Sequence, residues 1–165
     1  GEICISGPTV MMGYLNHPEE NAETLKVHDD GRTWVHTGDL GTMDEDGFIY
    51  LVDRKKDVII SGGENLYPVQ IEDFLRSHDA IRDVAVIGLP DQRLGEIAAA
   101  IIELKPDHPC TEEEIMAFCQ KLPRYKRPHK IIFADIPRNP TGKIEKPKLR
   151  KIYCGESLVA KQNHG

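Results

Sequence analysis

The loop at residues 139–143 carries one lysine, Lys143, beside two residues that favour tight turns, Pro140 and Gly142. A lysine at the tip of such a turn can extend into a neighbouring surface and bring a positive charge to a phosphate. When the α-phosphate of a nucleotide is attacked, negative charge spreads over the phosphoryl oxygens, and a cation that arrives for that step stabilises the transition state. Lys143 is therefore a candidate catalytic residue. The alternative is an ordinary exposed lysine in a turn.

Two further residues are candidates for binding a nucleotide. Asp39 is expected in a turn that follows a short strand at residues 33–37, where its carboxylate can accept two hydrogen bonds from a vicinal diol such as ribose. Arg54 follows an expected strand at residues 48–52 and can hydrogen-bond a ribose or a phosphate. The alternatives are an aspartate that stabilises its own turn and an arginine paired with a neighbouring aspartate, Asp53 or Asp57.

A pair of glycines, Gly62 and Gly63, follows an apolar strand and precedes a helix that is expected to begin at Tyr67-Pro68. Paired glycines allow the backbone to approach a ligand closely. The same pair also occurs in ordinary turns, so this signal is weak by itself.

Charge is distributed unevenly along the 165 residues, whose net charge is −6. Residues 121–151 contain eleven basic and two acidic side chains, a net of +9, which leaves −15 on the rest. This asymmetry indicates a local anion site, with a solvated basic face as the alternative. A non-catalytic nucleic-acid or adaptor module is a second class of function. It is disfavoured because few aromatic residues interrupt the basic stretch and no known reader motif is present.

The cysteines and histidines show no spacing typical of metal ligands, so we expect no metal site. The cysteines are far apart in the sequence, which predicts free thiols in a reducing, cytoplasmic location: Cys4, Cys110, Cys119 and Cys154. No apolar run is long enough for a transmembrane helix, and no signal peptide is visible. Because the chain begins with Gly1 on a strand-like segment, we interpret it as a fragment of a longer protein, with tag removal as the alternative.

The hydrophobic pattern predicts an α+β chain. Residues 1–53 are mostly β, and the charged run at residues 53–57 predicts an exposed connector, so we place a domain boundary near Lys56. Helices and strands alternate after it, and a capping box at Thr111 and Glu114 begins one helix. The expected helices begin near residues 67, 111 and 146, and the expected strands span residues 83–89, 97–104 and 130–133.

Taken together, the motifs resemble those of the adenylate-forming (AMP-binding) superfamily, which includes acyl-CoA synthetases, peptide-synthetase adenylation domains and beetle luciferases. The resemblance covers residues 1 to about 151. Five segments carry it in the family's order: Gly1-Glu2-Ile3 with Gly13-Tyr14-Leu15, Thr37-Gly38-Asp39-Leu40, the segment from Asp53-Arg54-Lys55-Lys56-Asp57 to Ile71-Glu72, Leu122-Pro123-Arg124-Tyr125-Lys126-Arg127-Pro128, and Pro140-Thr141-Gly142-Lys143-Ile144. At position 36 this chain has histidine where many members have arginine, which puts one supporting contact in doubt.

The resemblance implies a domain organisation. Residues 1–55 would be the C-terminal end of a large N-terminal domain, belonging to a small β-barrel-like subdomain. Residues 56–165 would be a compact, mobile lid with a three-stranded sheet flanked by helices. Lys56 matches the hinge about which such lids rotate. Two successive anionic transition states of different shape can be served by two poses of one lid.

The resemblance also implies roles for individual residues. Asp39 would bind the ribose hydroxyls of ATP, with Arg54 assisting, and Lys143 would bridge the carboxylate and the α-phosphate during adenylation. In the second pose, Gly62 and Gly63 would line a pantetheine tunnel. Tyr125 and Arg127 would then lie near the CoA nucleotide, a position that suits the basic stretch.

We therefore expect the C-terminal part of an acyl-CoA synthetase, which uses ATP, magnesium and CoA to activate a carboxylic acid such as a fatty acid. The Ser-Gly-Gly-Glu-Asn sequence at residues 61–65 is more similar to CoA ligases than to peptide synthetases. A peptide-synthetase lid that serves a carrier protein is the closest alternative. The phosphate-binding loop and the acyl pocket of the family are absent from the sequence, so the chain alone is expected to be inactive without the missing N-terminal domain.

Overall fold

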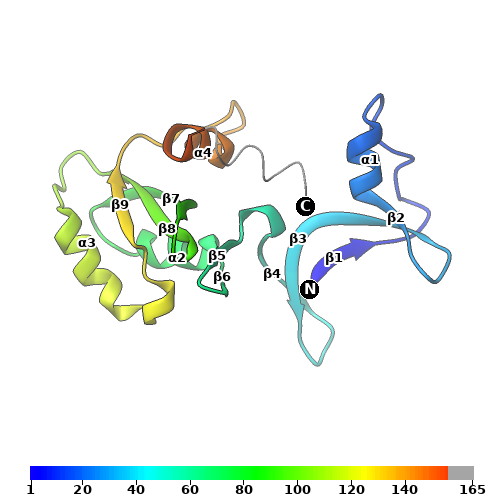
Figure 1. Cartoon of the computed structure of the whole chain (residues 1–165), viewed down its shortest axis with the longest axis horizontal. Helices are drawn as coiled ribbons and strands as arrows, with labels where there is room; N and C mark the ends of the chain where they lie inside the picture. Colours follow the sequence, from blue (N-terminus) through cyan, green and yellow to red (C-terminus); the bar gives the residue numbers. More distant parts are fainter. Residues whose placement is uncertain (156–165) are drawn as a thin grey trace. The chain divides into compact units, whose positions relative to one another are not determined.

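The computed structural model describes residues 1–155. The chain divides into two compact units, Gly1–Lys56 and Asp57–Gly165, whose elements are labelled in Figure 1. The predicted lid extends to residue 165, and its residues 156–165 lie outside the described part. No helix among the described residues is long and apolar enough to cross a membrane.

The N-terminal unit is an antiparallel sheet built around one long strand, β3. This strand pairs with β1 along one edge, and with β2 and β4 along the other. A short helix, α1, precedes β2. The bounds of these elements are β1 Glu2–Ile5, α1 Pro18–Thr24, β2 Leu25–Val27, β3 Thr33–Met43 and β4 Ile49–Arg54. Within the described residues the four strands form an open sheet and not a closed barrel.

Strand β3 is longer than the sequence predicts. A strand at residues 33–37 followed by a turn at Asp39 was expected, but the strand continues to Met43. Gly38 has a φ of +74° inside the strand, a conformation that glycine adopts without steric cost. The backbone therefore bends at Gly38 and continues, so Asp39 lies within a paired strand.

The charged run at residues 53–57 is only partly an exposed connector. Asp53 is 8% exposed and belongs with Arg54 to the end of β4, while Asp57 accepts a 2.7 Å hydrogen bond from the Arg150 guanidinium. Alternate side chains of a strand point to opposite faces, so Asp53 is buried where Arg54 is exposed. Lys56 lies in an exposed 3-10 turn, η1 (Lys55–Asp57).

The C-terminal unit is a five-stranded sheet with helices on both faces (Figure 1). Strand β8 pairs antiparallel with β7 and β5, and parallel with β9. The bounds are β5 Ile59–Ser61, β6 Glu64–Leu66, α2 Pro68–Arg76, β7 Ile81–Asp91, β8 Gly95–Leu104, α3 Glu112–Phe118, η2 Cys119–Lys121, η3 Arg124–Lys126, β9 Lys130–Phe133 and α4 Lys146–Cys154.

The α+β class is therefore confirmed, and so are the three strands predicted for this unit. The sheet has five strands rather than three because the hairpin β5–β6 adds two. Its two-residue turn consists of Gly62 and Gly63, whose φ angles are +58° and +87°. Positive φ at both central residues is what a tight hairpin turn of the primed type requires. The glycine pair thus has a backbone function whatever it binds.

The core is divided between the two faces of the sheet. Side chains of α2 and α3, with Cys119 just after α3, pack on one face, and Leu149 of α4 packs on the other. In Figure 1, α4 lies on the opposite side of the sheet from α3. Strand β8 contacts both layers because Ala98–Ile102 alternate between them and are fully buried.

A buried carboxylate connects three elements of this unit. Glu72 of α2 is 4% exposed. It accepts a 2.8 Å hydrogen bond from the backbone nitrogen of Val86 in β7 and pairs with Lys146 at the start of α4, 2.7 Å away. A buried charge is tolerated when it is paired and hydrogen-bonded. Glu72 thus fixes where α4 begins relative to the sheet.

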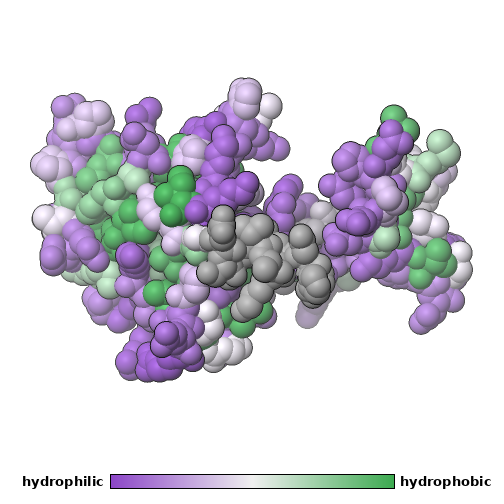
Figure 2. Space-filling model, turned by 45° about the horizontal axis from the view of Figure 1, so that its top comes forward, coloured by the Kyte–Doolittle hydropathy of each residue, from purple (hydrophilic) through white to green (hydrophobic). Residues whose placement is uncertain are grey.

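Large apolar side chains remain exposed, and Figure 2 shows hydrophobic surface on both units. In the N-terminal unit one group of them lies on the hairpin of β3 and β4, where consecutive residues on both faces of β4 are exposed: Met43, Phe48, Ile49, Tyr50 and Leu51. A strand of this composition is typical of a sheet covered on both faces.

The packing of α4 predicts that Leu149→Ala destabilises the C-terminal unit by about 2–5 kcal/mol, because it leaves a cavity beneath the sheet. Leu149 is 1% exposed, whereas Ile152 of the same helix is 65% exposed. Urea denaturation followed by far-UV circular dichroism measures the change. Ile152→Ala is the matched control and should change stability by no more than about 0.5 kcal/mol. Equal losses in the two variants would contradict this account of the core.

Candidate functional site

The two residues of the N-terminal unit that are predicted to bind a nucleotide are neighbours in space. Asp39 of β3 lies directly opposite Arg54 of β4 in the strand register. The Arg54 Nε atom lies 3.3 Å from Asp39 Oδ1, with the side chains 60% and 34% exposed. The Arg54 guanidinium thus pairs with Asp39, fifteen residues away, while the backbone nitrogen of Arg54 donates a 2.7 Å hydrogen bond to Asp53 Oδ1. The pair presents a carboxylate and a guanidinium at one exposed position, a combination that suits a polar ligand such as a diol.

Hydrogen bonds from β3 to acceptors in β1 hold the bend that places Asp39. The backbone nitrogen of Gly38 donates to Glu2 Oε1 at 3.2 Å, and the Thr37 hydroxyl donates to the carbonyl of Ile3 at 2.8 Å. The backbone nitrogen of Asp39 then donates to the Thr37 hydroxyl at 3.1 Å. Both neighbours of Asp39 on its N-terminal side are therefore tied to β1. A bent strand held in this way keeps the Asp39 carboxylate at one position.

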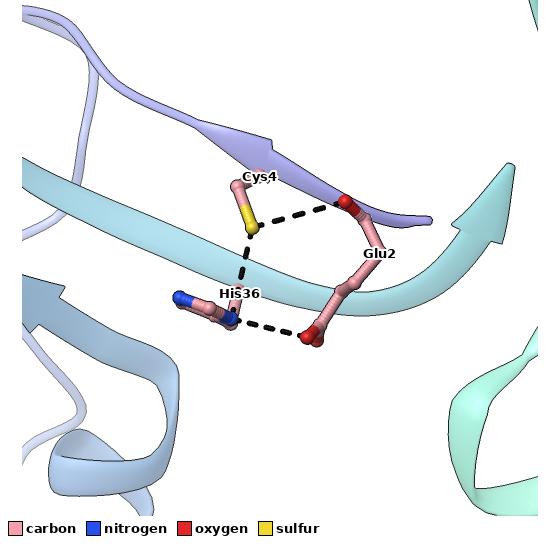
Figure 3. Close-up of side chains that lie close together, drawn as sticks. All are labelled: Glu2, Cys4 and His36. Carbon is pink, nitrogen blue, oxygen red and sulfur yellow. Dashed lines mark hydrogen bonds and ion pairs between the residues drawn. The ribbon is translucent and has the colours of Figure 1, made fainter. Parts of the chain in front are cut away.

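Figure 3 shows a cluster beside this bend that consists of Glu2, Cys4 and His36. The His36 Nδ1 atom lies 3.1 Å from Glu2 Oε2 and 3.6 Å from Cys4 Sγ. The three donor atoms lie within 4.8 Å of one another, close enough to hold a metal ion. The Lys55 ammonium, however, lies 3.1 Å from the same Glu2 oxygen. Because that positive charge already neutralises the carboxylate, we assign the cluster a structural role that joins β1 to β3.

The pKa directions agree with this role. Burial of the Glu2 carboxyl raises its pKa, but hydrogen bonds to His36 and Lys55 and their positive charges outweigh burial and hold the pKa below its usual value. Burial, and then the charge of Glu2, raises the pKa of the Cys4 thiol, which keeps it protonated at neutral pH. The sequence analysis missed this cluster because Cys4 and His36 are brought together only by strand pairing. The one signal of the cluster in the sequence was the two-residue spacing of Glu2 and Cys4, which places both side chains on one face of β1.

The lowered pKa of Glu2 predicts a pH-dependent contribution to stability. A carboxyl whose pKa is lower in the folded state stabilises the protein above its unfolded pKa, about 4.3, and this stabilisation is lost as the pH falls through the folded value. Glu2→Gln should therefore be more destabilising at pH 7 than at pH 3. Fluorescence of Trp34, the single tryptophan, reports thermal unfolding of this unit.

The control is Glu19→Gln, which removes the same charge from an exposed residue of α1. It should change the melting temperature much less than Glu2→Gln at pH 7. A Glu2→Gln effect of the same size at both pH values would contradict the assignment of Glu2 as a charged structural partner.

The lysine loop of the C-terminal unit is fixed from within by one side chain. The Asn139 Oδ1 atom accepts hydrogen bonds from the backbone nitrogens of Thr141 (3.1 Å) and Lys143 (2.8 Å), and from the Thr141 hydroxyl (2.7 Å). The backbone of Asn139 exchanges further bonds with Gly142 and Lys143, and Gly142 has a φ of +83°. The Lys143 side chain is exposed and makes no ion pair among the described residues. The loop thus holds the backbone of Lys143 and leaves its ammonium available.

The residues predicted to contact CoA lie in two neighbouring places of the same unit. Gly62 and Gly63 form the β5–β6 turn, and β6 contacts η3, which contains Tyr125. Tyr125 is half exposed. The Arg127 guanidinium, in contrast, is occupied by the chain itself, because it donates to the carbonyls of Leu122 (2.9 Å) and Gln120 (2.9 Å) and to the Gln120 side chain (2.6 Å). The Arg127 side chain therefore caps carbonyl groups at the end of the α3–η2 segment, a function that the sequence analysis did not anticipate.

Comparison with known proteins agrees with the motifs. Residues 70–143 match the family of AMP-binding enzyme C-terminal domains. The chain is 47% identical over 155 residues to the long-chain-fatty-acid–CoA ligase FadD13 of Mycobacterium tuberculosis, covering 93% of this chain and 30% of that protein. It is 45% identical over 154 residues to the 2-succinylbenzoate–CoA ligase of Bacillus mycoides, covering 92% and 31%. The chain thus spans less than a third of the length of these curated relatives.

A solved structure gives the same result. The o-succinylbenzoate CoA synthetase MenE of Bacillus subtilis, in complex with its acyl-adenylate intermediate, matches with a TM-score of 0.79 and 38% identity, covering 91% of this chain and 30% of that one. The same protein in complex with ATP and a magnesium ion matches with a TM-score of 0.77. The likeness therefore extends over nearly all of the present chain.

Proposed function

This chain belongs to the adenylate-forming superfamily of AMP-binding enzymes, and we propose that it is the C-terminal part of an ATP-dependent acyl-CoA synthetase. The whole enzyme would join a carboxylic acid to ATP, forming an acyl-adenylate and pyrophosphate. The thiol of CoA would then attack the acyl carbon and release AMP. Magnesium would enter with the phosphates of ATP. The CoA ligases among the relatives support this reaction class, and we propose a cytoplasmic location in keeping with the four free cysteines.

The observation that carries the proposal is the state of Lys143: its backbone is fixed by Asn139 while its ammonium is exposed and free of ion pairs among the described residues. During adenylation the carboxylate attacks the α-phosphate, and both groups are negative. An ammonium placed between them offsets their repulsion and the charge that develops on the phosphoryl oxygens. We propose that Lys143 performs this step and that the loop supplies its position.

In the N-terminal unit, we propose that the Asp39 carboxylate accepts hydrogen bonds from the two ribose hydroxyls of ATP and of the adenylate. Arg54 would assist by orienting this carboxylate and by contacting the nucleotide. Support comes from their cross-strand pairing at 3.3 Å and from their partial exposure. A carboxylate that keeps its second oxygen available for a diol can hold a neighbouring guanidinium at the same time.

For the movement of the lid, we propose residues 1–55 and 56–165 as the two domains and Lys56 as the hinge. Two observations support this choice. Lys56 is exposed in a short 3-10 turn, and the N-terminal compact unit ends at this residue. Hinges are commonly a few residues at the ends of elements that absorb a change in backbone angles.

For the second half-reaction, we propose that the glycine turn of β5–β6 and Tyr125 face the pantetheine and nucleotide of CoA. Gly62 and Gly63 leave room for a ligand because they lack side chains, and Tyr125 is exposed on the neighbouring η3. We retain Arg127 in this group, with its charge acting on the CoA phosphates over a longer range, since its donors are directed to Gln120 and Leu122.

We also propose that the chain is inactive without the rest of the enzyme. The exposed apolar residues of β4, among them Leu51 at 73% exposure, fit a strand covered by further protein. The acyl pocket would lie in that further protein, and it would determine which acid is used.

Lys143→Ala in the full-length enzyme should lower the rate of adenylate formation by at least about 100-fold, since one preorganised charge contributes that much or more. Thioester formation from supplied acyl-adenylate should be nearly unchanged, because the α-phosphate is then no longer being attacked. Release of pyrophosphate measures the first half-reaction, and release of AMP from acyl-adenylate and CoA measures the second.

Lys151→Ala provides the control, because it removes another exposed lysine of the same unit. It should leave both half-reactions unchanged. Equal losses in the two half-reactions of Lys143→Ala, or no loss in either, would refute the assigned role.

The identity of the thiol acceptor separates this proposal from its closest alternative, a lid that serves a carrier protein. With a preformed adenylate, the full-length enzyme should release AMP on addition of CoA and only at the background rate with a phosphopantetheinyl carrier protein. The reverse preference would assign the chain to the peptide-synthetase type. A salt-dependent gel shift with DNA or RNA, without CoA binding, would instead support a nucleic-acid module.

A further inference from the structure

We propose that Arg138 is a positioning residue for Lys143, a role that rests on the function proposed for that lysine. Arg138 occupies the base of the lysine loop, where it forms a β-bridge with Ile144. Its side chain turns back over the loop it precedes. The Arg138 Nη1 atom donates a 2.6 Å hydrogen bond to the carbonyl of Gly142, which belongs to the peptide bond that leads into Lys143.

The other end of the Arg138 guanidinium is anchored to the sheet. Its Nη2 atom pairs with the Asp83 carboxylate of β7. Asp83 is 13% exposed, and it accepts a 2.8 Å hydrogen bond from the backbone nitrogen of Val84. The Nε atom of Arg76 in α2 lies 3.6 Å from the same oxygen, Oδ1, while Arg138 pairs with Oδ2. One planar guanidinium therefore connects the peptide before Lys143 to a carboxylate that is itself held by the sheet and a helix.

This connection is distinct from the hydrogen bonds made by Asn139. The Asn139 side chain sets the internal shape of the loop, but all of its contacts lie within residues 139–143. Arg138, directly before the loop, connects the loop to β7 through its contacts with Gly142 and Asp83. Arginine suits the task because two donors of its rigid fork can serve two acceptors at once, whereas the lysine ammonium is a single point.

The rate of adenylation depends on how accurately the Lys143 ammonium is positioned. A displacement of about 1 Å at a reacting centre can lower a rate by about 100-fold. Without Arg138 the loop keeps its internal bonds, yet the Lys143 ammonium samples a wider range of positions. Adenylation, which needs that ammonium, becomes slower. The thioester-forming step, which does not use it, is unaffected.

The test is Arg138→Ala in the full-length enzyme. We expect adenylate formation to fall about 10- to 100-fold, with thioester formation from supplied acyl-adenylate unchanged. In a Lys143→Ala background, Arg138→Ala should cause no further loss, because Arg138 acts through that lysine. Arg138→Lys should recover part of the rate by keeping the pair with Asp83, and Asp83→Asn should reproduce the defect without removing volume.

Arg82→Ala is the matched control, since Arg82 also lies on β7 and pairs with a carboxylate, that of Glu103 at 2.9 Å. It should leave both half-reactions at the wild-type rate. If Lys143→Ala is impaired and Arg138→Ala is not, the positioning role is wrong and the proposed function stands. If Arg138→Ala slows both half-reactions equally, or adds to the loss in the Lys143→Ala background, Arg138 has a general structural role instead. If Lys143→Ala itself is unimpaired, the proposed function fails first.

Discussion

The role proposed for Lys143 requires a cation that is unpaired and yet held in place, and the C-terminal unit meets these opposing requirements with separate groups. The Lys143 ammonium has no anionic partner among the described residues, so its charge remains available. Other groups hold the backbone of the loop, chiefly the Asn139 side chain and the Arg138–Asp83 pair. A direct ion pair to Lys143 would fix the side chain but would also neutralise the charge on which its proposed role depends.

Holding the lysine loop in one position requires a rigid support, and the packing of the rest of the C-terminal unit provides it. Strand β8 is buried on both faces, and helices cover each face. Glu72 fixes the start of α4 through Lys146, so the segment between β9 and α4 is attached at both ends. The lysine loop lies in this segment, and the packed sheet therefore serves as its frame.

In the N-terminal unit, strand pairing holds the exposed side chains of Asp39 and Arg54 in place. The register of β3 and β4 places Asp39 opposite Arg54, and Glu2 holds the bend at Gly38 from the other side. His36 and Lys55 both contact the Glu2 carboxylate, each at 3.1 Å from Oε2, so this carboxylate is itself held in place.

Local chemistry in the sequence was sufficient for the elements whose causes are local. The capping box at Thr111 and Glu114 is present, the strand expected at residues 97–104 is found as β8, and the turn residues around Lys143 form the expected tight loop, because each depends on neighbours a few residues away. Only the tertiary structure decided which distant groups meet: Asp39 with Arg54, Glu2 with Cys4 and His36, Arg138 with Asp83, and the unexpected use of Arg127 within its own unit. Strand register and the packing of helices on a sheet determine such contacts, and a one-residue change of register would alter every one of those across β3.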